Sequence, residues 1–129
     1  MSRSGYSDDV DQWQLIKWRG AVASALRGKR GQEFLREMKV ALDVLPVKRL
    51  VKNELEADGE VCTLGAVGLK RGLPMTSLDP EDHDSIADAF GIAGAMAREI
   101  MYLNDEEGNE ETPEARYERM RAWVEAWTS

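Results

Sequence analysis

The chain has 129 residues, of which 43% are hydrophobic and 32% charged, with a net charge of −7 and a single cysteine. This length suits one domain with a buried core, and the hydrophobic content excludes a disordered chain. One cysteine excludes a disulfide framework within the chain and indicates a reducing compartment. No apolar run approaches the roughly 18 residues of a membrane span, and the polar N-terminus is unlike a signal peptide. We therefore expect a cytoplasmic protein with no membrane association.

The charge is distributed unevenly along the chain. Residues 17–52 hold ten Lys or Arg against three acids, whereas residues 53–129 hold six against eighteen. Such a division is typical of a basic contact surface on an acidic body, and equally of two halves that attract each other within the fold. Both interpretations stay open at the level of sequence.

The helical spacing of apolar residues predicts an all-α fold, a compact bundle of about five to six short helices. Residues 1–8 are expected to form a flexible arm, and residues 9–129 a single helical domain. The first helix is predicted over residues 9–27 and the second over 32–45. The four-residue turn Gly28–Gly31 between them predicts an antiparallel helical hairpin.

Leu15, Trp18 and Val22 recur at helical spacing in the first helix and predict its buried stripe. Residues 47–57 fit either a short helix or a strand. Asp79-Pro80 has the composition of a helix start, and so does Thr112-Pro113. The remaining helices are predicted over residues 61–70, 80–90 and 93–104, and from residue 113 onwards.

One segment has the spacing of a DNA-binding helix-turn-helix. Ala87 stands four residues before Gly91, where that motif places a small residue and its turn. Its second helix would offer only Arg98 to DNA, with Glu99 beside it and acids just beyond, which the phosphate backbone repels. An ordinary helix–glycine–helix corner is therefore favoured, and a DNA-binding regulator remains the alternative.

The basic half of the chain supplies the main candidate binding surface. Its glycine-flanked turn at Gly28–Gly31 can present cations to a phosphate or to an acidic protein, because glycine leaves the backbone open to approach. A solvated helix face is the competing interpretation. The candidate residues are Arg27, Lys29, Arg30, Arg36, Lys39, Lys48, Arg49 and Lys52.

The four tryptophans exceed what so small a core requires. Trp18 and Trp127 fall on apolar stripes and are expected in the core. Trp13 and Trp123 fall off those stripes, so each is a candidate anchor for a partner or for a second copy of the chain.

Little in the sequence supports catalysis or metal binding. His83 is the only histidine and Cys62 the only cysteine, and they lie far apart, so no nucleophile–base pair or zinc site is recognisable. The acids around His83 are consecutive on a helix and cannot converge on one ion. We expect a protein that is no enzyme and that uses no cofactor and no metal.

Seven short stretches carry a resemblance: MSRSGY (1–6), WRGAV (18–22), RGKRGQ (27–32), DGEVC (58–62), LGAVG (64–68), FGI (90–92) and EIM (99–101). Together they resemble a family of small proteins encoded by bacteriophages and prophages, over most of the chain. The resemblance brings no functional residues. It implies an accessory protein in the cytoplasm of a bacterial host, of the kind that binds host machinery and blocks or redirects it, host defences included.

The sequence thus predicts a non-enzymatic interaction protein whose basic surface binds a host or phage protein, with nucleic acid as a second class of partner. The helix-turn-helix regulator is the alternative function. Self-assembly through the opposed charges, for instance as a homodimer, is a third.

Overall fold

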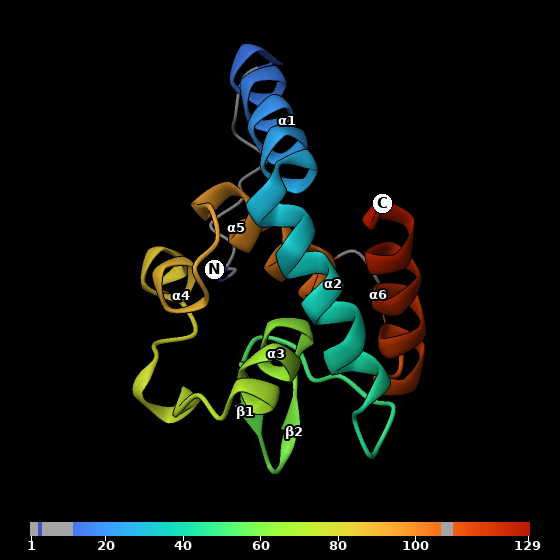
Figure 1. Cartoon of the computed structure of the whole chain (residues 1–129). Helices are drawn as coiled ribbons and strands as arrows, with labels where there is room; N and C mark the ends of the chain where they lie inside the picture. Colours follow the sequence, from blue (N-terminus) through green and yellow to red (C-terminus); the bar gives the residue numbers. More distant parts are fainter. Residues whose placement is uncertain (1–2, 4–11, 107–109) are drawn as a thin grey trace.

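The computed structural model describes residue 3, residues 12–106 and residues 110–129. It confirms the all-α fold: six α-helices pack on one another, and the sheet within the described ranges is a hairpin of two short strands (Figure 1). The elements in chain order are α1 (Gln12–Arg27), α2 (Lys29–Asp43), β1 (Glu56–Ala57), β2 (Glu60–Val61), α3 (Thr63–Arg71), the 3₁₀ turn η1 (Met75–Ser77), α4 (His83–Phe90), α5 (Gly94–Asp105) and α6 (Pro113–Trp127).

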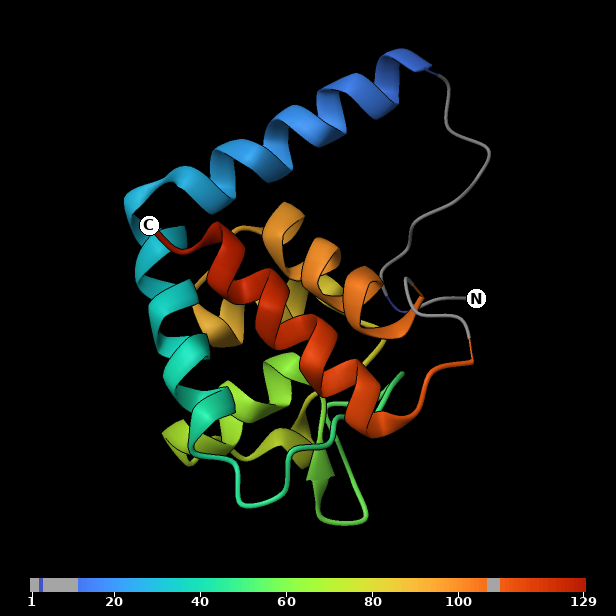
Figure 2. The same cartoon turned by 90° about the vertical axis from the view of Figure 1, so that its right-hand side faces the viewer.

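The first two helices meet at a corner. Gly28 alone separates them, so α2 begins at Lys29 and not at Gln32. The helices diverge from this corner, where the sequence predicted antiparallel packing (Figures 1 and 2). Gly31 is buried inside it, and a Cβ atom on Gly31 would overlap the carbonyl oxygen of Ala25. The corner therefore depends on direct backbone contact between the start of α2 and the end of α1.

Helix α5 lies in the middle of the molecule. It packs against α1, α3, α4 and α6, with α6 in front of it and α1 above it in Figure 2. Gly91, with a φ of 72°, ends α4 and turns the chain towards α5, as the sequence predicted. The buried apolar residues form one cluster, which includes Leu35 and Met38 of α2 and Ile100 and Met101 of α5.

The caps agree with prediction at α6 and differ at α4. The hydroxyl of Thr112 accepts a hydrogen bond from the backbone N–H of Ala115 at 3.1 Å, as a cap residue should. At α4 the cap is Asp82, whose Oδ1 accepts from the N–H of Ser85 at 3.1 Å. Asp79 and Pro80 therefore lie in a turn before the helix, and the prediction that α4 starts there is wrong.

Residues 47–57 form an irregular segment with only β1 at its end. Both of its buried leucines are held by backbone hydrogen bonds nearby: the N–H of Leu50 donates to Pro113 at 3.1 Å, and the N–H of Cys62 donates to Leu55 at 3.1 Å. These bonds to residues outside the segment take the place of hydrogen bonds within a local helix.

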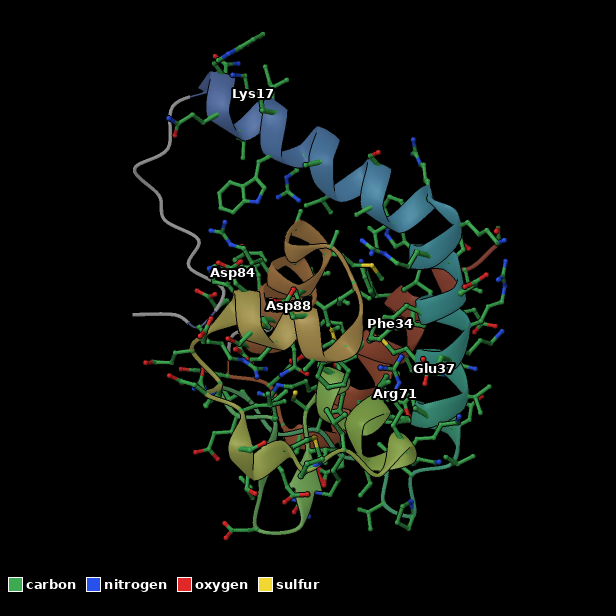
Figure 3. All side chains as sticks on the ribbon, turned by 60° about the vertical axis from the view of Figure 1, so that its left-hand side comes forward. Lys17, Phe34, Glu37, Arg71, Asp84 and Asp88 are labelled. Carbon is green, nitrogen blue, oxygen red and sulfur yellow. The ribbon has the colours of Figure 1, made fainter. Side chains whose placement is uncertain are left out.

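Arg71 joins three helices at one point. Its Nε and Nη2 donate to the carboxylate of Glu37 at 2.7 and 2.6 Å, and its Nη1 donates to the carbonyl of Phe90 at 3.2 Å. The guanidinium also lies over the rings of Phe34 and Phe90, at 5.6 and 5.8 Å from their centroids. Figure 3 shows Arg71 and Glu37 pointing towards one another from α3 and α2.

The ion pair of Glu37 gives a testable pH dependence. The hydrogen bond from Arg71 lowers the pKa of Glu37, although burial opposes this shift. A carboxyl whose folded pKa is depressed stabilises the protein above its unfolded pKa of about 4.3, and this stability is lost as the pH falls through the folded pKa.

We therefore expect Glu37→Gln to lower the free energy of unfolding by about 1 kcal/mol at pH 7 and by a shrinking amount below about pH 4. Urea unfolding of wild type and of Glu37→Gln, at pH 7 and at values below about pH 4, measures the difference in their free energies of unfolding. Glu118→Gln is the matched control, since Glu118 is exposed on α6 and makes no ion pair with any residue that the structure describes. If Glu37→Gln lowered the free energy of unfolding by the same amount down to pH 3, the prediction would be contradicted.

A buried polar cluster closes the C-terminal end of α5. Asn104 Oδ1 accepts from both the N–H and the hydroxyl of Thr63, at 3.1 and 2.7 Å, and its Nδ2 donates to the carbonyl of Val51 at 2.9 Å. Asp105 accepts from the Nη2 of Arg3 at 2.9 Å and from the N–H of Asn53 at 2.9 Å. The cluster therefore ties α5 to α3, to the irregular segment and to Arg3.

Arg3 departs from the predicted flexible arm. It is 3% exposed and is paired with Asp105. Burial opposes its charge, but the nearby Cys62 and Asp105 favour it, so that the pKa of Arg3 is raised. The prediction of a loose arm is wrong at this residue, whereas residues 1–2 and 4–8 lie outside the described ranges.

Candidate binding surface

The N-terminal half of α1 extends beyond the body of the molecule (Figure 2). Trp13, Leu15 and Ile16 are 63%, 42% and 55% exposed. The ammonium of Lys17 lies 5.4 Å from the ring centroid of Trp13. We call these four residues the α1 tip. Leu15 was predicted in the buried stripe, and this prediction is wrong because the burial of α1 begins only at Trp18.

The other half of α1 is anchored on α5. The guanidinium of Arg98 lies 4.8 Å from the ring centroid of Trp18, and Nη1 of Arg19 lies 3.3 Å from Oε2 of the buried Glu99. Val22 and Leu26 enter the core one and two turns later. Among the residues that the structure describes, α1 is therefore held along its second half, and the α1 tip is exposed at its other end.

Cations lie at the corner between α1 and α2 and along the first half of α2. Arg27, Lys29, Arg30 and Arg36 are all exposed, and none forms an ion pair with an acid in the described part of the chain. We call these four residues the basic elbow. The guanidinium of Arg27 also lies 5.7 Å from the ring centroid of Trp127. A pocket of about 210 Å³ separates the elbow from the start of α5, with Gly28 and Ala93 among its lining residues.

The other four residues of the predicted basic surface lie further along the chain. Lys39 pairs with Glu125 at 3.5 Å, and Arg49 lies between Glu60 and Glu114 at 3.4 and 3.6 Å. The ammonium of Lys48 donates to the carbonyls of Leu42 and Asp43, the last two residues of α2, at 3.4 and 2.5 Å, and so caps the helix.

Lys52 is exposed and follows this group in the chain. Helix α2 has 15 residues and spans about 22 Å, so it separates Lys48, Arg49 and Lys52, which lie beyond its end, from the start of the elbow, whereas Lys39 lies on α2 three residues after Arg36. The structure therefore does not bring the eight predicted residues into one patch.

The two predicted tryptophan anchors have different environments. Trp13 is exposed on the α1 tip, whereas Trp123 on α6 is half-buried and packs against the core. Trp18 and Trp127, both predicted in the core, are half-buried at its edge. Trp13 is thus the tryptophan best placed to contact another molecule.

The helix-turn-helix alternative places its recognition helix at α5. Seven of the twelve residues of α5 are buried, and four other helices cover it. Its one basic residue, Arg98, stacks on Trp18. A recognition helix must expose one face to enter the major groove, and this environment of α5 disfavours that role.

A second charged surface is acidic. It consists of eight exposed carboxylates, none of which pairs with a Lys or Arg among the residues described: Glu54, Glu56, Asp58, Asp79, Glu81, Asp82, Asp84 and Asp88. We call it the acidic face. Figure 3 shows Asp84 and Asp88 on α4, away from Lys17 at the outer end of α1.

The acidic face contains a small apolar hollow of about 170 Å³ between β1 and η1, lined by Glu54, Leu55, Glu56, Met75, Thr76, Leu78 and Pro80. Sequence reasoning gave the acidic excess of this half of the chain but not the hollow. Glu54–Glu56 and Met75–Pro80 are separated in the chain by all of α3, so only the fold brings them together.

No helix within the described ranges is long and apolar enough to cross a bilayer, and no three His, Cys, Asp or Glu side chains there are grouped to hold a metal ion. Comparison of the chain with protein-family models, with curated proteins and with solved structures finds no match.

Proposed function

We propose that the protein is a non-enzymatic binding protein that uses the α1 tip and the basic elbow to engage an acidic surface of another protein. One observation carries the proposal: a projecting helix exposes Trp13 and Ile16 one turn apart beside Lys17, and the cations of the basic elbow at its other end have no ion-pair partner among the described residues. Recognition of an amphipathic helix by an apolar groove uses anchors at this spacing. Tryptophan and arginine are also the residues most enriched in interface hot spots.

A phage accessory role fits this proposal. The resemblance implies a protein that binds its target stoichiometrically and so blocks or redirects it. The family resemblance suggests host machinery, including host defences, as the target.

Nucleic acid is the second candidate partner, favoured by the four cations of the basic elbow. A phosphate backbone offers no apolar surface on which Leu15 and Ile16 could pack. The negative charges of the acidic face also repel the phosphates. A protein partner accounts for both the apolar and the cationic residues, and so we rank it first.

The test is a comparison of four proteins in two assays. The tip variant Trp13→Ala/Ile16→Ala and the elbow variant Lys29→Glu/Arg30→Glu are compared with wild type. The control is Lys52→Glu/Lys70→Glu, which makes the same charge change at exposed lysines outside the elbow. The first assay captures partners from a bacterial lysate, and the second measures fluorescence anisotropy of labelled DNA at about 50 and 200 mM salt.

We expect the tip and elbow variants to lose the same captured protein, with affinity reduced at least tenfold in each, while the control retains it. Binding of labelled DNA at low salt that the elbow variant abolishes and the tip variant leaves intact would overturn the proposal in favour of nucleic acid.

A further inference from the structure

The thiol of Cys62 is buried at a helix N-terminus, and the proposed function does not use it. Its side chain is 0% exposed, and its Sγ accepts the N–H of Gly65 at 3.3 Å, so that Cys62 caps α3. Serine, threonine, aspartate and asparagine are the usual residues at this position, so capping alone does not account for a cysteine. Reactive cysteines are found at helix N-termini and beside cations, whereas burial keeps a thiol inert.

Two observations place Arg3 beside Cys62. The bond from the N–H of Thr63 to Asn104 brings the start of α3 against the end of α5, where Asp105 holds Nε and Nη2 of Arg3. Burial lowers the pKa of Arg3, but the neighbouring thiol of Cys62 and the carboxylate of Asp105 raise it above its ordinary value. The buried guanidinium therefore lies over the end of α3 that holds the thiol.

Arg3 is held less completely than a buried arginine requires. Its Nη1 is buried and has no hydrogen-bond partner among the residues that the structure describes. A buried donor without an acceptor destabilises the state that buries it, and water would solvate this donor if Arg3 left.

Asp105 keeps two donors when Arg3 leaves. Its Oδ1 also accepts from the N–H of Asn53 and from Nδ2 of Asn104, each at 2.9 Å. Release of Arg3 is therefore a local opening that leaves the rest of the polar cluster in place.

We propose that Cys62 is a site of thiol–disulfide exchange with small disulfides, and that release of Arg3 from Asp105 exposes its thiol. In this reaction Sγ of Cys62 attacks one sulfur of the disulfide. The new S–S bond forms as the old one breaks, and the second sulfur leaves as a thiolate that takes up the proton lost by Cys62. An excess of a small thiol reverses the exchange.

The mixed disulfide keeps Arg3 out of its place. A thiol that is 0% exposed has no room for an added group, so the guanidinium cannot return to Asp105 while the group is attached. The modified protein loses the ion pair between Arg3 and α5 and unfolds at a lower urea concentration. Neither Cys62 nor Arg3 belongs to the α1 tip or the basic elbow, so this inference and the proposed function stand or fall separately.

The rate of reaction with dithiobis(nitrobenzoate), a disulfide that releases a coloured thiolate, tests the inference on the full chain. Wild type is compared with Arg3→Ala and with the control Gly31→Ala, which disturbs the corner between α1 and α2 and leaves the polar cluster untouched. Cys62→Ser shows that the reaction occurs at the single cysteine of the chain. Each rate is measured at several urea concentrations below the unfolding transition.

We expect Arg3→Ala to react at least roughly tenfold faster than wild type, whereas Gly31→Ala reacts at the wild-type rate and Cys62→Ser does not react. The wild-type rate should depend only weakly on urea, because a local opening exposes little surface, whereas global unfolding gives the full urea dependence. Oxidised glutathione should add one glutathione to wild type, detected by mass spectrometry, and lower its urea midpoint.

A wild-type rate with the full urea dependence of global unfolding would overturn the inference, and this measurement requires no variant. The inference is also wrong if Arg3→Ala reacts no faster than wild type, if Gly31→Ala accelerates the reaction as much as Arg3→Ala does, or if no glutathione adduct forms.

Discussion

Gly31→Ala is expected to destabilise the protein by about 3 kcal/mol. The added methyl group meets a rigid backbone contact, which cannot move aside as a flexible side chain would. The added Cβ overlaps the carbonyl oxygen of Ala25, which belongs to the backbone of α1 and cannot rotate away. The corner must open, and α1 must shift relative to α5. The change therefore also moves the α1 tip relative to the basic elbow.

Gly20→Ala in the middle of α1 is the matched control. No atom lies within 4 Å of a Cβ at Gly20, and the residue is exposed, so the helix gains up to about 1 kcal/mol from the propensity of alanine. Urea unfolding followed by circular dichroism measures both variants. Equal effects of the two changes would show that the backbone contact at the corner does not constrain α1.

Asn104→Ala is expected to cost about 4 kcal/mol. The side chain is 1% exposed, and its loss leaves the N–H of Thr63 and the carbonyl of Val51 without their partners inside the protein. Each buried polar group without a partner costs about 1–3 kcal/mol, and a small cavity adds to this.

Thr63→Val removes only one bond of this cluster, because the amide oxygen of Asn104 still accepts from the N–H of residue 63. We expect a loss of about 1 kcal/mol. The double variant should cost less than the sum of the two, since the bond between the two side chains is already absent in each. Strict additivity in urea unfolding would contradict the contact as described.

Sequence reasoning succeeded for most features with local determinants, although the start of α4 at Asp82 and the start of α2 at Lys29 are local features that it placed wrongly. The helices, the cap at Thr112 and the turn at Gly91 follow from periodicity and from residues within one turn of the chain. It failed where a distant segment decides. Leu15 has helical spacing like Val22, but α5 reaches only the second half of α1.

The same distinction between local and distant determinants applies to the eight cations of the predicted basic surface. The cations of the elbow are close in sequence, so their clustering was predictable. The fate of Lys48 and Arg49 was not, because a helix terminus and two distant acids engage them. Nothing in a sequence distinguishes Arg3, which pairs with Asp105 across the fold, from an arginine on a loose arm.

The clamp made by Gln32 has a practical consequence for measuring these contacts. Its Nε2 donates to the carbonyls of Leu26 and Trp127 at 2.7 and 2.9 Å, and its Oε1 accepts from the N–H of Ser129 at 2.9 Å. Ser129 therefore lines the same pocket as Arg27, beside the basic elbow, where Figure 2 shows the C-terminus. A fluorophore attached at Ser129 would therefore report on molecules that arrive at the elbow, separately from the α1 tip at the other end of the helix.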